Sequence, residues 1–253
     1  MFTNLYDNME KDYKDTGNKS LVCMWSGGCD STLVLHQLLT TLKETGDKRT
    51  VTTFSFCHAQ LGEPKMDAEL TARMSYTAFA KKSELPLGLN KVIAIDRHNI
   101  SATTGSCPQP ALWVSHVIPY IEDNSILFLG YHRGDDFWSY GVFNPWAQAF
   151  IGLSRLFNKK IECRTPLHWA SKVEIIRQLK TANIYDHTWY CEGCQSNGKP
   201  CGNCTPCQTH LMADLYLKHT ENKAMTTQFV DSDRTVDLPN ISSLTSADVA
   251  NAK

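Results

Sequence analysis

The sequence predicts an α/β fold, a doubly wound parallel sheet of the Rossmann-like type with a small C-terminal zinc-binding segment. Short apolar runs alternate with stretches whose apolar residues recur at helical spacing, a pattern typical of βαβ units. A Gly-Gly turn joins the first apolar run to the first helical stretch. Half of the ten cysteines fall between Cys191 and Cys207, which favours a local metal site over a disulfide framework.

Composition narrows the class of protein. The chain has 253 residues and a formal net charge of -1, which fits one large domain with appendages. It contains no long basic run, which argues against nucleic acid as a partner. No apolar run approaches the roughly 20 residues that span a bilayer, and the start of the chain does not resemble a signal peptide. We therefore expect a soluble, cytoplasmic protein without a membrane partner.

Strands are expected where β-branched, aromatic and apolar residues cluster, at residues 21–25, 50–56, 91–95, 125–130 and 161–164. Helices are expected from residue 30 onward and over 65–82, 111–121, 144–158 and 171–182. In the second of these helices Leu70, Met74 and Phe79 should face inward, and Ser171 should cap the last.

The strand order along the chain also predicts where a ligand binds. In parallel sheets, ligands bind beyond the carboxyl ends of the strands. The turns after Trp25, Phe56, Ile95 and Gly130 should therefore face one pocket. Residues 131–140 follow the fourth strand and combine charged, aromatic and hydroxyl side chains, so we expect them to line that pocket; a polar surface loop is the alternative. The nine histidines show no metal-ligand spacing and are interpreted as ordinary core or surface residues.

The sharpest signal is a six-residue loop, here called the anion loop, made of Ser26, Gly27, Gly28, Cys29, Asp30 and Ser31. Adjacent glycines let the backbone turn sharply and approach a ligand, while the first N–H groups of the following helix point into the turn. Those N–H groups and the serine hydroxyls favour phosphate. No lysine follows the glycines, so the loop is not of the G-x-x-x-x-G-K-[ST] type. A glycine turn without a ligand is the alternative.

Three charged or reactive residues need separate interpretation. Asp30 would repel phosphate, so it either caps the helix or acts through magnesium. Cys29 is interpreted as a tolerated small residue rather than a redox centre. Lys172 lies in the first turn of a helix, where the macrodipole disfavours a cation. This placement suggests an anionic partner for Lys172, with a solvated lysine as the alternative.

The cysteine cluster has the spacing C-x2-C-x6-C-x2-C-x2-C. Short C-x-x-C turns bring thiolates to one ion, and tetrahedral zinc takes four of them in a closed, structural site. Three ligands are expected to be Cys201, Cys204 and Cys207, and the fourth is either Cys191 or Cys194. A disulfide or an iron–sulfur cluster is the alternative. From about residue 219 the polar tail is expected to be extended or partly disordered.

Several motifs together resemble a known family. The anion loop is similar to the S-G-G-x-D-S loop of the PP-loop ATP pyrophosphatases, whose fold is HUP-like. With the late C-G-x-C-x-x-C, residues 20–215 resemble the QueC family, the 7-cyano-7-deazaguanine synthases. Smaller similarities are Gly130 followed by Asp135, Asp136, Phe137, Ser139 and Tyr140, then Thr165-Pro166-Leu167 with Lys172, and Thr188-Trp189-Tyr190-Cys191. The last of these favours Cys191 over Cys194 as the fourth zinc ligand.

The resemblance implies an ATP-dependent carbon–nitrogen ligase that uses Mg²⁺ and one structural Zn²⁺. Its substrates would be 7-carboxy-7-deazaguanine and ammonia, and its product 7-cyano-7-deazaguanine, a queuosine precursor. ATP would be bound by the anion loop with Phe56, Gly130 and Lys172. The deazaguanine would meet Asp135, Asp136, Ser139, Tyr140 and Lys172. The implied organisation is an arm over 1–19, a PP-loop domain over 20–188, a zinc-binding segment and helix over 189–219 and a tail over 220–253, in a protein that is commonly a homodimer.

The chain also departs from the family. The family has Gln at the position of Cys29, a Y-x-Q-R-H stretch at Phe56-Cys57-His58-Ala59-Gln60, and G-R-N at Cys107-Pro108-Gln109-Pro110. Two arginine-bearing substrate motifs are therefore missing. The alternatives are an enzyme that stops at the amide or joins the deazaguanine to another amine, such as a protein, and a non-catalytic nucleotide-binding scaffold. The tRNA thiolases and lysidine synthases of the PP-loop class are less favoured, because the chain lacks a basic face and a thiolation cysteine pair.

Overall fold

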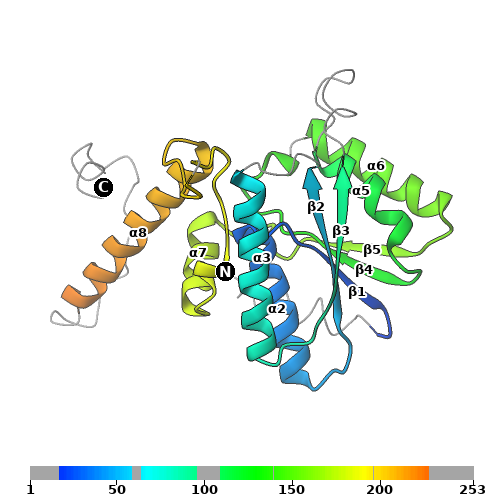
Figure 1. Cartoon of the computed structure of the whole chain (residues 1–253), viewed down its shortest axis with the longest axis horizontal. Helices are drawn as coiled ribbons and strands as arrows, with labels where there is room; N and C mark the ends of the chain where they lie inside the picture. Colours follow the sequence, from blue (N-terminus) through cyan, green and yellow to red (C-terminus); the bar gives the residue numbers. More distant parts are fainter. Residues whose placement is uncertain (1–16, 59–63, 96–108, 139, 196, 228–253) are drawn as a thin grey trace.

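The computed structural model describes residues 17–58, 64–95, 109–138, 140–195 and 197–227. They form a five-stranded parallel sheet with helices on both faces, which confirms the predicted fold class (Figure 1). The strands are β1 (Ser20–Met24), β2 (Val51–His58), β3 (Leu87–Ile95), β4 (Ser125–Phe128) and β5 (Ile161–Arg164). The helices are α2 (Cys29–Thr45), α3 (Pro64–Lys82), α5 (Gln109–Val117), α6 (Tyr140–Leu156), α7 (Lys172–Thr181) and α8 (Thr205–Thr227). Single 3₁₀ turns are η1 (Ile118–Tyr120), η2 (Asp136–Trp138) and η3 (Tyr185–His187).

The strand order places a ligand-binding edge at the centre of the sheet. The order is β3-β2-β1-β4-β5, so the chain runs outward from β1 to β3 and then crosses to the other side for β4 and β5. The direction of winding reverses between β1 and β4. In open parallel sheets this switch point opens a crevice at the carboxyl ends of the strands. The anion loop follows β1 and therefore starts at this crevice.

The central strand β1 is buried on both faces. Leu21 and Cys23 pack with α2, α3 and α7, whereas Val22 and Met24 pack with α5 and α6. This alternation follows from the two-residue period of a strand and produces two hydrophobic cores, one on each face of the sheet. The continuous apolar run at 21–25 is therefore explained by its position in the middle of the sheet.

The inward face of α3 differs from the prediction. Leu70 and Met74 are 47% and 65% exposed, and the buried face is formed by Ala72, Tyr76 and Ala80. Two alanines four residues on either side of a tyrosine let α3 lie close to its neighbours while Tyr76 fills the remaining space. The predicted face was wrong because larger apolar residues were preferred to alanines. Phe79, also predicted to face inward, is partly buried against the same core.

Helix α8 also differs from the prediction. It continues to Thr227, so an extended chain from residue 219 onward is wrong for 219–227. Its first half packs on α7, where Ala213 and Leu217 meet Ile176. The remainder of the predicted tail, 228–253, and residues 1–16 of the predicted arm lie outside the described residues.

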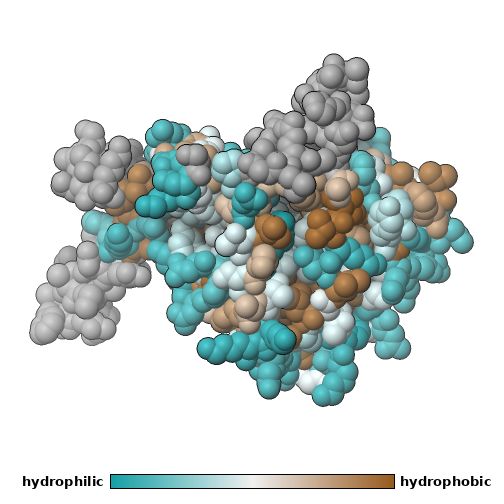
Figure 2. Space-filling model, in the orientation of Figure 1, coloured by the Kyte–Doolittle hydropathy of each residue, from teal (hydrophilic) through white to brown (hydrophobic). Residues whose placement is uncertain are grey.

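The surface seen in Figure 2 is mostly hydrophilic or mixed, with hydrophobic groups gathered at the end of α6. There Ile151, Leu156 and Phe157 are exposed. Among the described helices, none combines the length and the apolar character that a membrane crossing requires.

Candidate functional site

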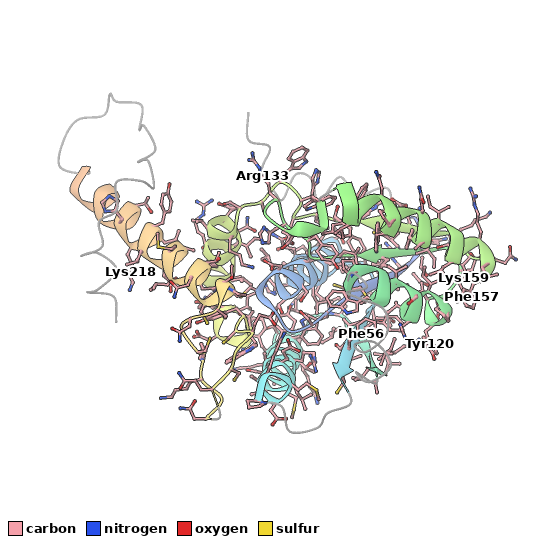
Figure 3. All side chains as sticks on the ribbon, turned by 90° about the horizontal axis from the view of Figure 1, so that it is seen from above. Phe56, Tyr120, Arg133, Phe157, Lys159 and Lys218 are labelled. Atoms are coloured by element: carbon pink, nitrogen blue, oxygen red, sulfur yellow. The ribbon has the colours of Figure 1, made fainter. Side chains whose placement is uncertain are left out.

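A cavity of about 930 Å³ opens at the carboxyl edge of the sheet. Its size is within the range of small-molecule and cofactor sites. Figure 3 looks down on this edge and labels two residues that line the cavity, Phe56 near the end of β2 and Arg133 in the segment after β4. The anion loop, the segment after β4, the start of α7 and the start of α8 also line it. The predicted convergence is seen for the turns after Trp25 and Gly130 and for Phe56 itself, while the turns that follow β2 and Ile95 lie outside the described residues.

The backbone of the anion loop is tightly held, and glycine is required at its turn. Gly27 has φ of +89°, and a Cβ there would lie 2.9 Å from the carbonyl oxygen of Glu69. Gly28 is the N-cap of α2 and receives no side-chain cap. The free N–H groups of the first turn of α2 therefore remain available at the cavity, where a bound anion can satisfy them.

A second glycine brings β4 against this helix start. A Cβ on Gly130 would lie 2.7 Å from the backbone nitrogen of Ser31 and 2.8 Å from its Cα. These are backbone atoms that cannot rotate away. Gly130 thus permits the close approach that forms one side of the anion site, as the family resemblance implied for this position.

The two serine hydroxyls of the loop lie side by side. Ser26 Oγ and Ser31 Oγ are 3.1 Å apart, and the Gly28 N–H donates to Ser26 Oγ at 3.1 Å. The Ser31 hydroxyl also accepts from the Ser26 N–H at 3.3 Å. Both hydroxyls face the same turn and can exchange these internal contacts for a phosphate oxygen.

Two neighbouring segments anchor the loop from outside. The Arg73 guanidinium of α3 donates to the Ser26 carbonyl at 2.7 Å, and the Trp189 N–H donates to the Gly27 carbonyl at 2.9 Å. Both donors satisfy carbonyls, so the loop keeps its N–H groups directed elsewhere. Arg73 is almost fully buried, a placement that the apolar pattern of α3 could not reveal.

Asp30 pairs with Lys172 across the cavity. The Lys172 ammonium lies 2.8 Å from Asp30 Oδ1 and 2.7 Å from Oδ2. A capping role was one of the two alternatives expected for Asp30, but its side chain does not cap α2. The anionic partner expected for Lys172 is a residue of the same chain. Burial is the largest single influence and acts to lower the pKa of Lys172, but the charge and hydrogen bonds of Asp30 and the effects of its neighbours together outweigh it, so the pKa is raised. Lys172 consequently stays protonated.

The Cys29 thiol is buried beside this pair. Its Sγ lies 3.1 Å from Thr188 Oγ1, and burial raises its pKa to about 12 although Lys172 acts in the opposite direction. A thiol that stays protonated is a poor nucleophile. This environment favours the interpretation of Cys29 as a small packing residue.

The segment after β4 contributes a carboxylate. His132 donates its backbone N–H to Asp135 Oδ2 at 2.7 Å, and its Nε2 lies 3.3 Å from Asp135 Oδ1. Burial raises the pKa of Asp135, partly offset by His132. Phe137 is buried and stacks on Tyr131, with ring centroids 4.0 Å apart, so this residue of the motif is part of the core. Ser139 and the side chains of Asp136 and Tyr140 lie outside the described residues.

Two aromatic side chains form one wall of the cavity, near the end of β2. Phe56 and Trp113 stack with ring centroids 5.7 Å apart and planes 9° from parallel. Both line the cavity, together with Met66. The sequence predicted Phe56 at this site but not Trp113 or Met66. Both of these residues lie on helices, and the sequence does not show which residues of those helices reach the cavity.

The cysteine cluster forms a compact four-sulfur group. Cys191, Cys201, Cys204 and Cys207 place their sulfurs within 4.8 Å of one another. The Cys191–Cys204 and Cys201–Cys207 sulfurs are 3.9 and 4.0 Å apart, close to the separation of about 3.8 Å in a tetrahedron with Zn–S bonds of about 2.3 Å. Sulfurs this close fit one ion, whereas a multi-iron cluster places its cysteines on separate irons.

The two cysteines predicted as alternatives for the fourth ligand differ in position. Cys191 is in the group, and Cys194 is outside it, with its Sγ directed at the Gln195 and Lys199 carbonyls. The Cys201 N–H donates to Cys191 Sγ at 3.1 Å, as backbone donors do around metal-bound sulfur. Cys191 also lines the cavity, so the group holds one wall of the site in place.

The fold and the site define a class: an α/β protein with a glycine-rich loop at the switch point of a parallel sheet. More specifically, residues 142–215 match the family model described as "Queuosine biosynthesis protein QueC". This segment contains Thr165-Pro166-Leu167, Lys172 and the four clustered cysteines, and confirms the resemblance there. This chain is therefore similar to the QueC family over residues 142–215.

Comparison with solved structures gives more distant similarities. The U34-tRNA thiolase NcsA from Methanococcus maripaludis, solved with its [4Fe-4S] cluster, is 13% identical, with a TM-score of 0.48 over 96% of this chain and 86% of that one. A glutamine-dependent NAD⁺ synthetase from Acinetobacter baumannii, in complex with ADP, is 10% identical, with a TM-score of 0.36 over 94% of this chain and 47% of that one. No curated protein matches the sequence. Similarities this low say nothing about the activity of this chain.

Proposed function

We propose that this protein uses ATP to activate the carboxylate of 7-carboxy-7-deazaguanine by adenylation, and that ammonia then displaces AMP on the path to 7-cyano-7-deazaguanine. The observation that carries the proposal is the placement of Lys172, from the QueC-like region, against the anion loop at the switch point of the sheet. This arrangement joins the two motifs of the family resemblance in one cavity.

The anion loop would hold the β- and γ-phosphates of ATP. The N-terminus of α2 supplies backbone N–H groups and the hydroxyls of Ser26 and Ser31 supply two more donors. Lys172 would neutralise phosphate charge, in competition with Asp30. Mg²⁺, when bound, supplies further neutralisation of the phosphates, and the Asp30 carboxylate is the oxygen ligand that the loop offers to it.

The rest of the cavity suits a planar heterocycle. The parallel rings of Phe56 and Trp113 offer an aromatic surface, and Asp135 offers a hydrogen-bonding carboxyl group. A deazaguanine has a flat ring system and several N–H donors. Its recognition by these residues is part of the proposal.

The chemistry proceeds by two activations. The substrate carboxylate attacks the α-phosphate of ATP, pyrophosphate leaves, and the acyl adenylate has a good leaving group. Ammonia attacks the acyl carbon and AMP departs, which gives the amide. The amide oxygen then attacks the α-phosphate of a second ATP and pyrophosphate leaves; departure of AMP with its oxygen and loss of the two N–H protons give the nitrile. The protein contributes positioning and charge stabilisation to each step.

A second candidate is an enzyme that stops at the amide or joins the activated deazaguanine to another amine. The departures from the family motifs support this second candidate. The arginines found in the family are missing from Phe56-Cys57-His58-Ala59-Gln60 and from Cys107-Pro108-Gln109-Pro110. Neither departure falls within the anion loop, residues 26–31. Zn²⁺ would be held by the four clustered cysteines and would stabilise the wall that they form.

The test is a mass-spectrometric assay of the purified protein with ATP, magnesium, ammonia and 7-carboxy-7-deazaguanine, beside Ser26→Ala and Asp30→Ala variants. Nitrile that disappears in the variants supports the proposal. Amide alone, or a protein adduct, supports the second candidate. ATP binding without pyrophosphate release under any of these conditions would contradict both and favour a non-catalytic scaffold.

A further inference from the structure

His210 is a buried polar side chain at the cavity that the sequence motifs do not explain. It lies in α8, lines the cavity and is 2% exposed. Within the part of the chain that the structure describes, its Nε2 atom has no hydrogen-bond partner. A buried nitrogen without a partner costs free energy, so such atoms in a ligand site are commonly satisfied by the ligand.

The imidazole ring is held rigidly by two aromatic neighbours. It stacks on Tyr190, with ring centroids 3.9 Å apart and planes 9° from parallel. Its Nδ1 lies 3.1 Å from the hydroxyl of Tyr185. When that hydroxyl donates to Nδ1, the ring proton must lie on Nε2. In that arrangement the neutral ring is a hydrogen-bond donor at Nε2, with this N–H turned away from Tyr185.

The cavity around His210 has a field that attracts anions. Three helices begin at it: α2 contributes Cys29 to Ser31, α7 contributes Ser171 and Lys172, and α8 contributes Thr205, Pro206 and Thr209. Each helix start carries partial positive charge. His210, in the second turn of α8, adds a polar group at the cavity, close enough to Lys172 and Asp30 to interact electrostatically with both.

Backbone contacts connect this corner to the anion loop. Trp189 donates to the Gly27 carbonyl, and the next residue, Tyr190, carries the ring on which His210 stacks. A single extended segment therefore separates the loop from the imidazole. The position of His210 relative to a phosphate held by the loop is fixed by this segment.

We propose that the Nε2–H of His210 donates a hydrogen bond to the phosphate anion that the anion loop holds, and so completes the anion site from the side of α8. This inference rests on the proposed ATP-binding function. It assigns His210 a role in binding and in orienting the phosphate chain. His210 does not act as an acid or a base in this proposal.

Two matched substitutions separate the roles of the two ring nitrogens. In His210→Gln the amide nitrogen can take the place of Nε2, whereas in His210→Asn it can take the place of Nδ1. Isothermal titration calorimetry with Mg-ATP, and separately with inorganic pyrophosphate, should show about a tenfold loss of affinity for His210→Asn and a change of less than about threefold for His210→Gln. Both variants should retain the metal content and the unfolding temperature of the wild type, which controls for damage to the nearby cysteine group.

Three outcomes would overturn the inference. Wild-type affinity in both variants would show that Nε2 makes no contact with the anion. A loss in His210→Gln with retention in His210→Asn would show that only the contact with Tyr185 matters. If the wild type binds neither Mg-ATP nor pyrophosphate, the proposed function itself fails, and this inference with it.

A second measurement does not depend on the variants. In ¹⁵N NMR spectra of imidazole-labelled wild-type protein, His210 should be protonated at Nε2, and that signal should move when pyrophosphate is added. Protonation at Nδ1, or a signal that pyrophosphate leaves in place, would refute the proposed donor role.

Discussion

The ammonium of Lys172 bridges both carboxylate oxygens of Asp30, at 2.8 and 2.7 Å. The two residues are 142 positions apart in the sequence, and their contact joins the first turns of α7 and α2. An acid next to a phosphate site is repulsive unless a cation neutralises it. Lys172 therefore neutralises the negative charge of Asp30, which would otherwise repel an anion. A phosphate that enters the cavity competes with Asp30 for the same ammonium.

Replacement of Lys172 by Met should lower the affinity for Mg-ATP by about tenfold or more. The substitution removes the cation that contacts the phosphates and leaves the negative charge of Asp30 without a partner. The double variant Asp30→Asn with Lys172→Met removes both charges. It should recover thermal stability relative to Lys172→Met but should not recover binding. Calorimetric titration and thermal unfolding of the same samples measure the two effects separately.

Lys180→Met is the matched control for this experiment. Lys180 lies near the other end of α7 and pairs with Asp214 of α8, outside the cavity. Its loss should leave Mg-ATP affinity unchanged. Equal affinity in the wild type and in Lys172→Met would disprove the role assigned to the pair.

Local patterns predicted much of the site. The strand, glycine turn and helix at 21–39 form as expected because each is encoded by neighbouring residues: a buried apolar run, two glycines and a helical repeat. Ser171 caps α7 through a bond from the Glu174 N–H, again over three residues. The cysteine spacing predicted the metal group, although spacing alone could not choose between Cys191 and Cys194.

The features that sequence could not show are contacts between distant segments. The partner of Lys172 lies on another helix, and Arg73 of α3 reaches the Ser26 carbonyl in the anion loop. Trp113 and His210 line the cavity because α5 packs on the sheet and α8 packs on α7. Such placement depends on packing of the whole chain, which a single sequence does not display.

Gly130→Ala should strongly weaken Mg-ATP binding. Its Cβ would lie 2.7 Å from the backbone nitrogen of Ser31, so the first turn of α2 must move away from the end of β4. Displacement of these N–H groups weakens the anion site. Calorimetric titration of Mg-ATP and thermal unfolding are the measurements.

Gly141→Ala is the control for that substitution. Gly141 lies in α6, and a Cβ there meets nothing within 4 Å. Alanine should stabilise the helix by roughly 0.5–1 kcal/mol and leave binding unchanged. If Gly130→Ala binds Mg-ATP as well as Gly141→Ala does, the close approach at Gly130 is irrelevant to the anion site.

The purified protein should contain about one zinc ion per chain, and Cys191→Ser should remove it while Cys194→Ser should not. The reason is geometric, since Cys191 belongs to the four-sulfur group and Cys194 does not. Because structural zinc contributes on the order of 10 kcal/mol of binding free energy, Cys191→Ser and chelation of the wild type should each lower the unfolding temperature sharply. Elemental analysis by mass spectrometry and thermal unfolding give the answer. Zinc retained in Cys191→Ser, or iron in place of zinc in the wild type, would contradict the assignment.

Acid should destabilise the fold partly through His36. Burial between α2 and α3 lowers the pKa of His36 to about 4 from an ordinary value of 6.5, so the unfolded chain binds the proton more tightly than the folded one. The contribution of a neutral His36 is therefore fully present above pH 6.5 and is lost as the pH falls toward 4, by at most about 3 kcal/mol. Urea unfolding at a series of pH values should show a shallower loss for His36→Asn, which keeps an amide near the position of Nδ1 and its contact with Tyr76. His219→Asn, at an exposed position in α8, is the control, and its free energy of unfolding should depend on pH as that of the wild type does. If the free energy of unfolding of His36→Asn depends on pH in the same way as that of the wild type, His36 is not the group that titrates.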